Sequence, residues 1–317
     1  MNGVLFVTDP LGGLAADIDA TIGMMDATQR LGHAVWCCGP EDLAVVDGLL
    51  VARAHHIRLR PRHPGVDHRW IVDPTWFDEL TTDVVPVSEF AVVHLRIDPP
   101  VDERYLHTTY LLDLAGTRVI NRADGVRAIH EKLIALRFPD LCPPTSVGTS
   151  VTDLRDFVAQ AGTAIVKPVD GFAGLDVWLV PDDHAATSLL ESATRGGRRQ
   201  VIAQQYLPAV AHGNKRLFLL DGEIVGAVLR RPAAADFRIG PPVAVAPIDA
   251  ADLAIAAALR PVLVQHGLAI AGADVIGGRL IEVNVTCPGG MHKTDALLGT
   301  NLSETIVRRL TREGVLT

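Results

Sequence analysis

The sequence predicts an α/β protein, α+β in part, built from two or three packed lobes. Its 317 residues exceed what one hydrophobic core usually serves. The first third alternates strand patterns with helix patterns, an order that produces a parallel sheet with helices on its faces. Later segments run strand, glycine turn, strand, which indicates antiparallel hairpins. A cleft between lobes is then the natural place for a small-molecule site.

The composition excludes several classes of protein. Hydrophobic residues make up 48% of the chain, and the formal charge of -8 argues against a broad nucleic-acid-binding surface. The most apolar stretch, residues 253–276, contains Arg260, His266 and Asp274, so it indicates a buried helix and a strand instead of a membrane span. The chain opens directly into an apolar strand with no basic leader, and we expect a cytoplasmic protein with no nucleic-acid or membrane partner.

The cysteines indicate reduced thiols. They show neither the spacing of metal ligands nor that of a small disulfide-bonded domain. Two of them sit in an apolar strand and one lies beside the site inferred below. The four are Cys37, Cys38, Cys142 and Cys287.

The first lobe begins with an apolar strand pattern at residues 4–8. Asp19 or Thr21 can cap a helix that continues to about Leu31, and Gly32 can end it. The turn after the first strand lacks the G-x-G-x-x-G pattern that binds a pyrophosphate, which argues against a nicotinamide cofactor. The site of this lobe should lie at the carboxyl ends of its strands. Further strands are predicted at residues 33–38, 90–95 and 118–121.

The remainder of the chain contains helices and hairpins beyond a domain boundary near Arg122. Residues 52–69 have little periodicity and are compatible with a hairpin or a loop. Helices are predicted at residues 125–138 and 153–160, from about Asp249, and at 303–312. Strands are predicted at residues 164–168, 216–220 and 223–229, followed by a hairpin near the C-terminus.

That hairpin, residues 273–284, carries a pattern that suits a metal ion. Glu282 and Asn284 are two residues apart and share one face of a strand. A three-residue loop at 277–279 sets Asp274 opposite Glu282, whereas a two-residue loop turns it to the other face, and we expect the longer loop. Oxygen ligands of these types suit Mg²⁺ bound jointly with ATP phosphates, with Mn²⁺ as a substitute. A half-exposed polar hairpin is the alternative.

A strand that ends at Lys167 runs into a glycine-containing loop at residues 171–174. Such a loop can present backbone N–H groups to phosphates while the lysine supplies positive charge. Strand-ending lysines and glycine turns are common, so this motif is not specific by itself. Lys132, with its acidic neighbour, is also compatible with an ordinary solvated lysine.

Two further segments are compatible with nucleotide binding and with simpler roles. Residues 204–207 follow an apolar strand and can hold an adenine by backbone hydrogen bonds, or merely end the strand. Lys215 and Arg216 lead into a strand-turn-strand that brings Arg230 to its far end. An arginine there can meet the charge of a transferring phosphoryl group, or lie in water at the edge of a sheet.

The order of these motifs resembles that of the bacterial glutathione synthetases of the ATP-grasp superfamily. The motifs lie at residues 121–132, 167–171, 204–208, 215–216 and 274–284. The resemblance extends into the first lobe and covers nearly the whole chain. It implies an ATP-grasp fold preceded by a Rossmann-like (pre-ATP-grasp) lobe, with domains at 1–121, 122–205 and 206–317.

The resemblance also implies roles for individual residues. Arg230 and Lys167 would be catalytic, and Asp274, Glu282 and Asn284 would hold the metal ion. ATP would contact Lys132, Lys167, Gly171, Phe172, Gly174, Gln204, Gln205, Tyr206, Leu207, Lys215 and Arg216. The substrates would contact Asp19, Arg96, Arg238, Asn284, Thr286, Gly289 and Gly290.

The implied activity is that of an ADP-forming carboxylate–amine ligase that works through an acyl phosphate on amino-acid or dipeptide substrates. The segments that face the substrates depart from the family pattern, which favours a γ-glutamyl amino-acid ligase. The departures are the short segment 231–242, Asp17 to Asp19 in place of lysines, Ile97, Ala173, and His292 in place of an arginine. Glutathione synthetase proper is the alternative, followed by a non-catalytic ATP-binding protein. The family also implies a homo-oligomer, a dimer or a tetramer.

Overall fold

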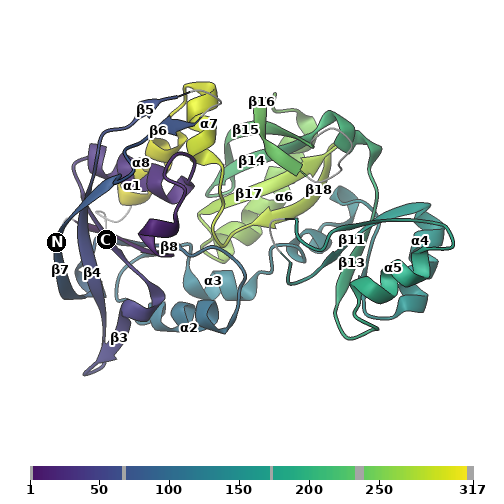
Figure 1. Ribbon diagram of the computed structural model, residues 1–317, viewed down its shortest axis with the longest axis horizontal. Helices are drawn as coiled ribbons and strands as arrows, with labels where there is room; N and C mark the ends of the chain where they lie inside the picture. The colour runs from purple at the N-terminus through teal and green to yellow at the C-terminus, as the bar shows by residue number, and fades with distance from the viewer. Residues whose placement is uncertain (1–2, 66–68, 172–173, 233–238, 313–317) are drawn as a thin grey trace.

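The computed structural model describes residues 3–65, 69–171, 174–232 and 239–312, which form three main β-sheets with helices packed around them. In Figure 1 the first sheet lies at the left, the sheet of β14 to β18 at the centre, and the sheet of β10 to β13 at the right. The last described helix, α8 (Leu302–Arg312), lies on the same side as the first sheet. The mixed α/β class predicted from the sequence is confirmed.

The first sheet has the strand order β3-β4-β2-β1-β8-β9, with β7 also paired to β4. Its centre is parallel, as predicted, because β1 pairs in parallel with β2 and β8, and β8 with β9. The segment that was compatible with a hairpin or a loop begins as part of the long antiparallel strand β4 and later contributes the short strand β5. The strands are β1 (Gly3–Thr8), β2 (Ala34–Cys38), β3 (Leu43–Val46), β4 (Leu49–Leu59), β7 (Phe77–Pro86), β8 (Val92–Arg96) and β9 (Val119–Ile120). A small separate sheet pairs β5 (His63–Pro64) with β6 (Trp70–Ile71).

Helix α1 (Ala20–Arg30) begins where the sequence predicts. The Asp19 carboxylate accepts hydrogen bonds from the backbone N–H groups of Thr21 at 2.7 Å and Ile22 at 3.3 Å, and Gly32 follows the helix with a φ of 84°. Its buried side shares a hydrophobic core with the last helix, α8 (Leu302–Arg312). The last described helix therefore packs against the first lobe.

The helix predicted over residues 125–138 is wrong as a single element. Helix α3 (Ala123–Ala128) ends at Ile129, which is extended, and only a short 3-10 turn, Ile134–Arg137, follows. The segment between these two elements bonds to β18 instead, because the backbone carbonyl of Glu131 accepts a hydrogen bond from the backbone N–H of Val283 at 3.0 Å. Tertiary bonding to the last hairpin therefore replaces a turn of helix.

The second sheet is a small antiparallel one with the order β10-β13-β11-β12. Helices α4 (Val151–Ala161) and α5 (Ala186–Ala193) pack on it through a core that includes Leu154, Leu190 and Val166. The strands are β10 (Thr145–Gly148), β11 (Thr163–Pro168), β12 (Trp178–Pro181) and β13 (Val201–Gln205).

The third sheet is antiparallel, with the order β16-β15-β14-β17-β18. Helix α6 (Ala250–Gln265) begins at the predicted Asp249 cap and packs on one face, where Ile255 and Leu259 join the core of the sheet. The opposite face is divided, because Phe218 and Leu220 join the core that includes α8, while Arg216 is one of the polar side chains on the remainder. The strands are β14 (Asn214–Leu220), β15 (Glu223–Pro232), β16 (Ile239–Val245), β17 (Ile270–Ile276) and β18 (Arg279–Asn284).

The hairpin of β17 and β18 corrects one prediction and confirms another. Ile276 pairs with Arg279, so the loop has two residues, Gly277–Gly278, both with positive φ, and the predicted three-residue loop is wrong. An irregularity in the register after Asp274 nevertheless places Asp274 opposite Glu282, as predicted. A β-bulge can supply this register because it adds one residue to one strand of the pair.

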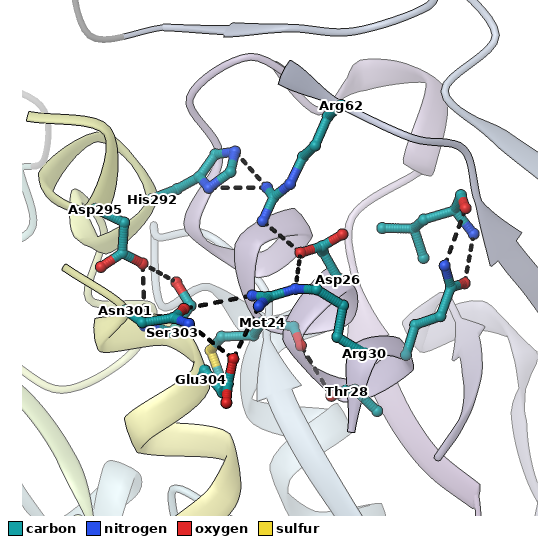
Figure 2. A network of polar contacts seen from close by, with 12 residues as sticks. Met24, Asp26, Thr28, Arg30, Arg62, His292, Asp295, Asn301, Ser303 and Glu304 are labelled. Carbon is teal, nitrogen blue, oxygen red and sulfur yellow. Dashed lines mark hydrogen bonds and ion pairs between the residues drawn. The ribbon is translucent and has the colours of Figure 1, made fainter. Parts of the chain in front are cut away.

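A polar network ties α1 to the last two helices, α7 (Met291–Leu298) and α8 (Figure 2). The Asp26 carboxylate on α1 accepts hydrogen bonds from Arg30 at 2.8 Å and Arg62 at 2.6 Å. The Arg62 guanidinium also lies beside His292 of α7, whose ring stacks on Trp70 with centroids 5.0 Å apart. Burial, with Arg62, lowers the pKa of His292 to about 2, so this histidine is neutral.

Two further expectations concern the chain as a whole. Cys37, Cys38 and Cys142 are buried, Cys287 is partly exposed, and none of the four is in a disulfide bond. Among the helices that the structure describes, none combines the length and the apolar composition needed to cross a membrane.

Candidate active site

A cavity of about 400 Å³ lies between the second and third sheets. Its walls come from β11 and β13 on one side and from β14, β15, β17 and β18 on the other. Many of the residues implied by the family resemblance meet here. Those that line it are Lys132, Lys167, Gly171, Gly174, Gln204, Gln205, Tyr206, Leu207, Arg216, Arg230, Asp274, Glu282 and Asn284. Phe172 and Arg238, also expected at the site, lie outside the described residues.

One end of the cavity is apolar and bordered by the segment 204–207. Ile165, Ile276 and Ile281 contribute to its wall. The backbone N–H groups of Gln205 and Tyr206 already donate to the carbonyls of Pro144 at 2.9 Å and Thr163 at 3.0 Å. A flat ligand ring in this end would therefore find apolar surface, and its polar edge would need backbone groups other than these two.

Two lysines reach the cavity from different elements. Lys132 precedes the 3-10 turn, and its ammonium donates to the backbone carbonyl of Gly171 in the glycine-containing loop. Burial lowers the pKa of Lys132, with Lys167 acting in the same direction. Lys167 is buried at the end of β11, and its Nζ lies 3.7 Å from a carboxylate oxygen of Glu282. The cavity thus gathers positive charge beside the loop, as a phosphate-binding site requires.

The floor of the cavity is a row of charged side chains across the third sheet. Asp274 accepts hydrogen bonds from Arg216 Nε at 2.5 Å and Arg216 Nη2 at 3.0 Å, and Arg230 Nη2 lies 2.7 Å from its Oδ1. Burial alone would raise the pKa of Asp274, but the two guanidiniums lower it to about 2. Asp274 is therefore ionised at neutral pH and holds both arginines against the floor of the cavity.

The residues predicted to hold a metal ion offer oxygen atoms to the cavity. The Glu282 side chain is 25% exposed, and its ion pair with Lys167 is long. Asn284 uses its side-chain nitrogen to donate to the carbonyl of Gly272 at 3.2 Å, which leaves its oxygen as an available acceptor. Carboxylate and amide oxygens fit a hard divalent cation. Within the described ranges no group of three or more His, Cys, Asp or Glu residues could hold a metal ion, so these oxygens would need others from a nucleotide or water.

Lys215 is a correction to the predicted nucleotide ligands. Its Nζ lies 2.9 Å from Asp249 and 2.5 Å from Asp252, at the start of α6, and it does not line the cavity. The reason is the alternation of side chains along a strand, because Arg216 faces the cavity and its neighbour must face the opposite side. The residue stabilises the N-terminus of α6 instead.

The predicted substrate residue Arg96 lies at the carboxyl end of β8. It is 3% exposed, and its guanidinium donates to the Thr21 hydroxyl at 3.1 Å and to the carbonyl of Pro288 at 3.3 Å. Burial raises the pKa of Asp19, and nearby Arg96 opposes that shift. The Thr8 hydroxyl, on the neighbouring strand, is buried with no hydrogen-bond partner in the described chain. A buried guanidinium and an unpartnered hydroxyl therefore meet at the edge where a site was expected.

The segment after β18 is fixed by Glu131, which the sequence analysis noted only as the acidic neighbour of Lys132 and gave no role. One carboxylate oxygen of Glu131 accepts from the backbone N–H groups of Val285 at 2.6 Å and Thr286 at 2.8 Å, and from the Thr286 hydroxyl. Thr286, a predicted substrate residue, is thus committed to the protein. Gly289 is exposed, and Gly290 precedes α7 with a φ of 94°. Only the position of Glu131 beside Lys132 could have indicated its importance.

Asn214 is a second residue that the sequence analysis missed. It is 2% exposed and lines the cavity, and its side-chain oxygen accepts hydrogen bonds from Arg230 Nε at 3.2 Å and Nη2 at 2.7 Å. Its position two residues before Arg216 places it on the same face of β14, which is the signal that could have found it.

Comparisons with known proteins agree with this geometry. The family description "Prokaryotic glutathione synthetase, N-terminal domain" matches residues 3–127, and "Prokaryotic glutathione synthetase, ATP-grasp domain" matches residues 131–299. A glutathione synthetase of Synechocystis sp. is 39% identical over 310 residues, which cover 95% of this chain and 97% of the relative.

Solved structures show the same fold at lower identity. The crystal structure of a D-cycloserine synthetase has a TM-score of 0.66 and 20% identity, with 98% of this chain and 100% of the other covered. A RimK domain ATP-grasp protein from Sphaerobacter thermophilus has a TM-score of 0.60 and 19% identity, with 96% and 98% covered. The ATP-grasp fold implied by the sequence is therefore confirmed.

Proposed function

The chain belongs to the prokaryotic glutathione synthetase family of ATP-grasp carbon–nitrogen ligases, and we propose that it joins two amino-acid-derived substrates with ATP and Mg²⁺. The observation that carries the proposal is the row of charged side chains on the third sheet. Arg216, Arg230 and Asp274 face a cavity that also receives Lys132 and Lys167. This arrangement suits the charge of a nucleoside triphosphate and its metal ion.

The chemistry follows from the low reactivity of a carboxylate. A carboxylate does not acylate an amine at neutral pH, so its oxygen first attacks the γ-phosphorus of ATP. The bond from that phosphorus to ADP breaks, and an acyl phosphate forms. The amine then attacks the acyl carbon, phosphate leaves, and the amine loses a proton. In this scheme Lys132, Lys167 and Arg230 offset the charge of the moving phosphoryl group.

The proposed metal ligands are Glu282, Asn284 and Asp274. A Mg²⁺ ion held by these side chains would act as a Lewis acid and withdraw charge from the phosphoryl group. Glu282 and the oxygen of Asn284 support this role because neither is saturated by protein contacts. Asp274 is held by two arginines, so its share in metal binding requires at least one of these contacts to change.

The proposed position of the nucleotide follows the polarity of the cavity. The adenine lies in the apolar end beside residues 204–207, and the phosphates lie toward Lys132, Lys167 and the loop that includes Gly171. The hydrogen bond from Lys132 to that loop supports this orientation, since both would contact the same phosphates.

The carboxylate donor is proposed to bind beside Arg96. A guanidinium can bind a carboxylate through two hydrogen bonds, and Arg96 forms no ion pair with a carboxylate among the described residues. Asp19 and Asp98 lie close enough for Asp98 to raise the pKa of Asp19, so negative charge is also available for an ammonium group. A free α-amino-acid end, as in a γ-glutamyl compound, presents both charges.

Two products are compatible with such a donor. We favour a γ-glutamyl amino-acid ligase, because the segments that the family resemblance places at the substrates depart from the family pattern, among them Asp17 to Asp19 and Ile97. Glutathione synthetase proper, which joins glycine to γ-glutamylcysteine, is the second candidate, favoured by relatives of that name such as the one in Synechocystis sp..

The test is phosphate release with ATP and Mg²⁺ across pairs of carboxylate donors and amine acceptors, with products identified by mass. The pairs include glutamate with assorted amino acids and γ-glutamylcysteine with glycine. Turnover with glutamate and an amino acid supports the favoured product, and rapid turnover of the second pair alone establishes glutathione synthesis. ATP binding without turnover of any pair contradicts the ligase proposal.

A matched variant tests the donor site separately. Arg96→Lys keeps one positive charge but loses the two-pronged contact. We expect KM for the carboxylate donor to rise about tenfold or more, because a charged hydrogen bond contributes about 1.5 to 3 kcal/mol. KM for ATP should stay unchanged. A rise in KM for ATP instead of the donor would contradict the placement of the donor beside Arg96.

A further inference from the structure

Arg230 is held from two sides by groups of different charge. On one side the neutral oxygen of Asn214 accepts from its Nε at 3.2 Å and its Nη2 at 2.7 Å. On the other side the same Nη2 lies 2.7 Å from Oδ1 of Asp274. Asn214 and Arg230 are directly opposite each other on β14 and β15, so the first contact is set by strand register. Arg230 thus shares its donors between an amide and a carboxylate.

The carboxylate side of this arrangement is the one that a metal ion would use. Asp274 also binds Arg216 through both carboxylate oxygens, so its acceptor capacity is already engaged. A divalent cation at Asp274 would compete with the guanidinium of Arg230 for Oδ1 and would repel it, since both are positive. Metal binding and the contact between Arg230 and Asp274 therefore oppose each other.

We propose that Asn214 is a positioning residue of the ligase reaction, which keeps Arg230 directed into the cavity when a metal ion displaces it from Asp274. The inference rests on the proposed function, because it assumes the metal and phosphate roles given above. Asn214 touches no reacting atom in this account and acts only through Arg230.

The neutrality of Asn214 is what this role requires. Its oxygen accepts two hydrogen bonds without cancelling the positive charge that the transferred phosphoryl group needs. An aspartate of the same shape would hold the guanidinium more firmly and would add negative charge beside the phosphates. Asn214 is 2% exposed, so water cannot readily replace its contacts. Without Asn214, Arg230 would depend on Asp274 alone.

The experiment is a titration of the nucleotide-free protein with Mn²⁺, followed by electron paramagnetic resonance. In Asn214→Ala, Arg230 keeps Asp274 as its partner and competes more strongly with the metal ion. The Mn²⁺ dissociation constant should therefore rise about fivefold, a change in binding free energy equivalent to about one hydrogen bond. Arg230→Ala removes the competitor and should strengthen Mn²⁺ binding by a similar factor. In the double variant the effect of Asn214→Ala should vanish, because Asn214 acts through Arg230. Asn214→Ser provides the same test if the alanine variant does not fold.

Several results would overturn the proposal. One is an unchanged Mn²⁺ dissociation constant in Asn214→Ala, and another is an equal weakening by Asn214→Ala with or without Arg230. Mn²⁺ binding that is undetectable in both the wild type and Arg230→Ala would contradict the competition itself. The titration needs no substrate, so a failure of the proposed ligase activity would appear only in the turnover assays.

A kinetic readout separates positioning from general structural damage. For both Asn214→Ala and Asn214→Asp we expect kcat to fall about tenfold or more, with KM for ATP within about twofold of the wild type. Full activity of Asn214→Asp would contradict the requirement for a neutral acceptor. A rise in KM for ATP with kcat unchanged would make Asn214 a nucleotide contact and would also overturn the proposal.

Discussion

Glu282→Gln is expected to remove activity while leaving the fold intact. Among the residues that the structure describes, the Glu282 side chain forms one ion pair, with Lys167 at 3.7 Å, and it is 25% exposed. A partly exposed pair of this kind contributes at most about 1 kcal/mol to the free energy of unfolding. A charged metal ligand is much harder to replace, because loss of even an outer-shell partner lowers activity about 10- to 100-fold. We therefore expect a fall of at least about 100-fold in kcat.

Asp274→Asn is the control variant, because it also converts a carboxylate to an amide on the same face of the third sheet. Two buried guanidiniums would lose their counter-charge, which lowers the free energy of unfolding by about 3 to 5 kcal/mol. Urea denaturation followed by tryptophan fluorescence measures both variants, and ADP formation measures activity. Equal destabilisation of the two variants, or full activity of Glu282→Gln, would refute the assignment of separate roles.

Lys215→Met is expected to lower the free energy of unfolding by about 3 kcal/mol, since fully buried Asp252 loses its ion pair, and to leave KM for ATP unchanged. A raised KM for ATP in that variant would contradict its placement outside the site. His94→Phe is expected to reduce acid sensitivity. Burial, with Arg96 and Arg118, lowers the pKa of His94 from 6.5 to about 3, so its folded state stays neutral while the unfolded state binds a proton below 6.5. The contribution of neutral His94 to the free energy of unfolding is complete above about pH 6.5 and falls below that pH, by about 2 kcal/mol at about pH 5. Urea denaturation midpoints are therefore compared above about pH 6.5 and at about pH 5. A difference between the two midpoints that is as large in the variant as in the wild type would contradict this reasoning.

The order of the elements was the most predictable part of the fold. Helix α1 was predictable because the cap at Asp19 and the stop at Gly32 are local signals. The break after α3 was not, because it depends on a hydrogen bond between Glu131 and Val283, residues far apart in the sequence. Local propensity favours a helix there, and tertiary contacts prevail.

The site shows the same division between local and distant causes. The pairing of Asp274 with Glu282 was predicted from an incorrect loop length. It occurs because the strand register shifts after Asp274, and no sequence pattern predicts that shift. Lys215 was misplaced because two adjacent basic residues were assigned one role, although a strand turns them to opposite faces. Asn214 was missed because a single polar residue at a strand start acquires meaning only through the arginine opposite it.

The lobes explain why such a site can protect a reactive intermediate. The cavity has walls from two sheets that do not share strands, and the loop that includes Gly171 and Gly174 borders it. Lys132 joins the two sides through its hydrogen bond to Gly171. The acyl phosphate of the proposed reaction would be hydrolysed in open water, and enclosure between lobes would limit that loss.

The central claim is the transfer of oxygen from the carboxylate donor to phosphate. The measurement uses a donor labelled with ¹⁸O in its carboxylate, with ATP, Mg²⁺ and the amine acceptor identified by the turnover screen, and analyses the released phosphate by mass. We expect one labelled oxygen in each phosphate, because the attacking oxygen leaves with the phosphoryl group when the amine displaces it. Released phosphate without label would show that no acyl phosphate forms, and would contradict the proposed ligase mechanism.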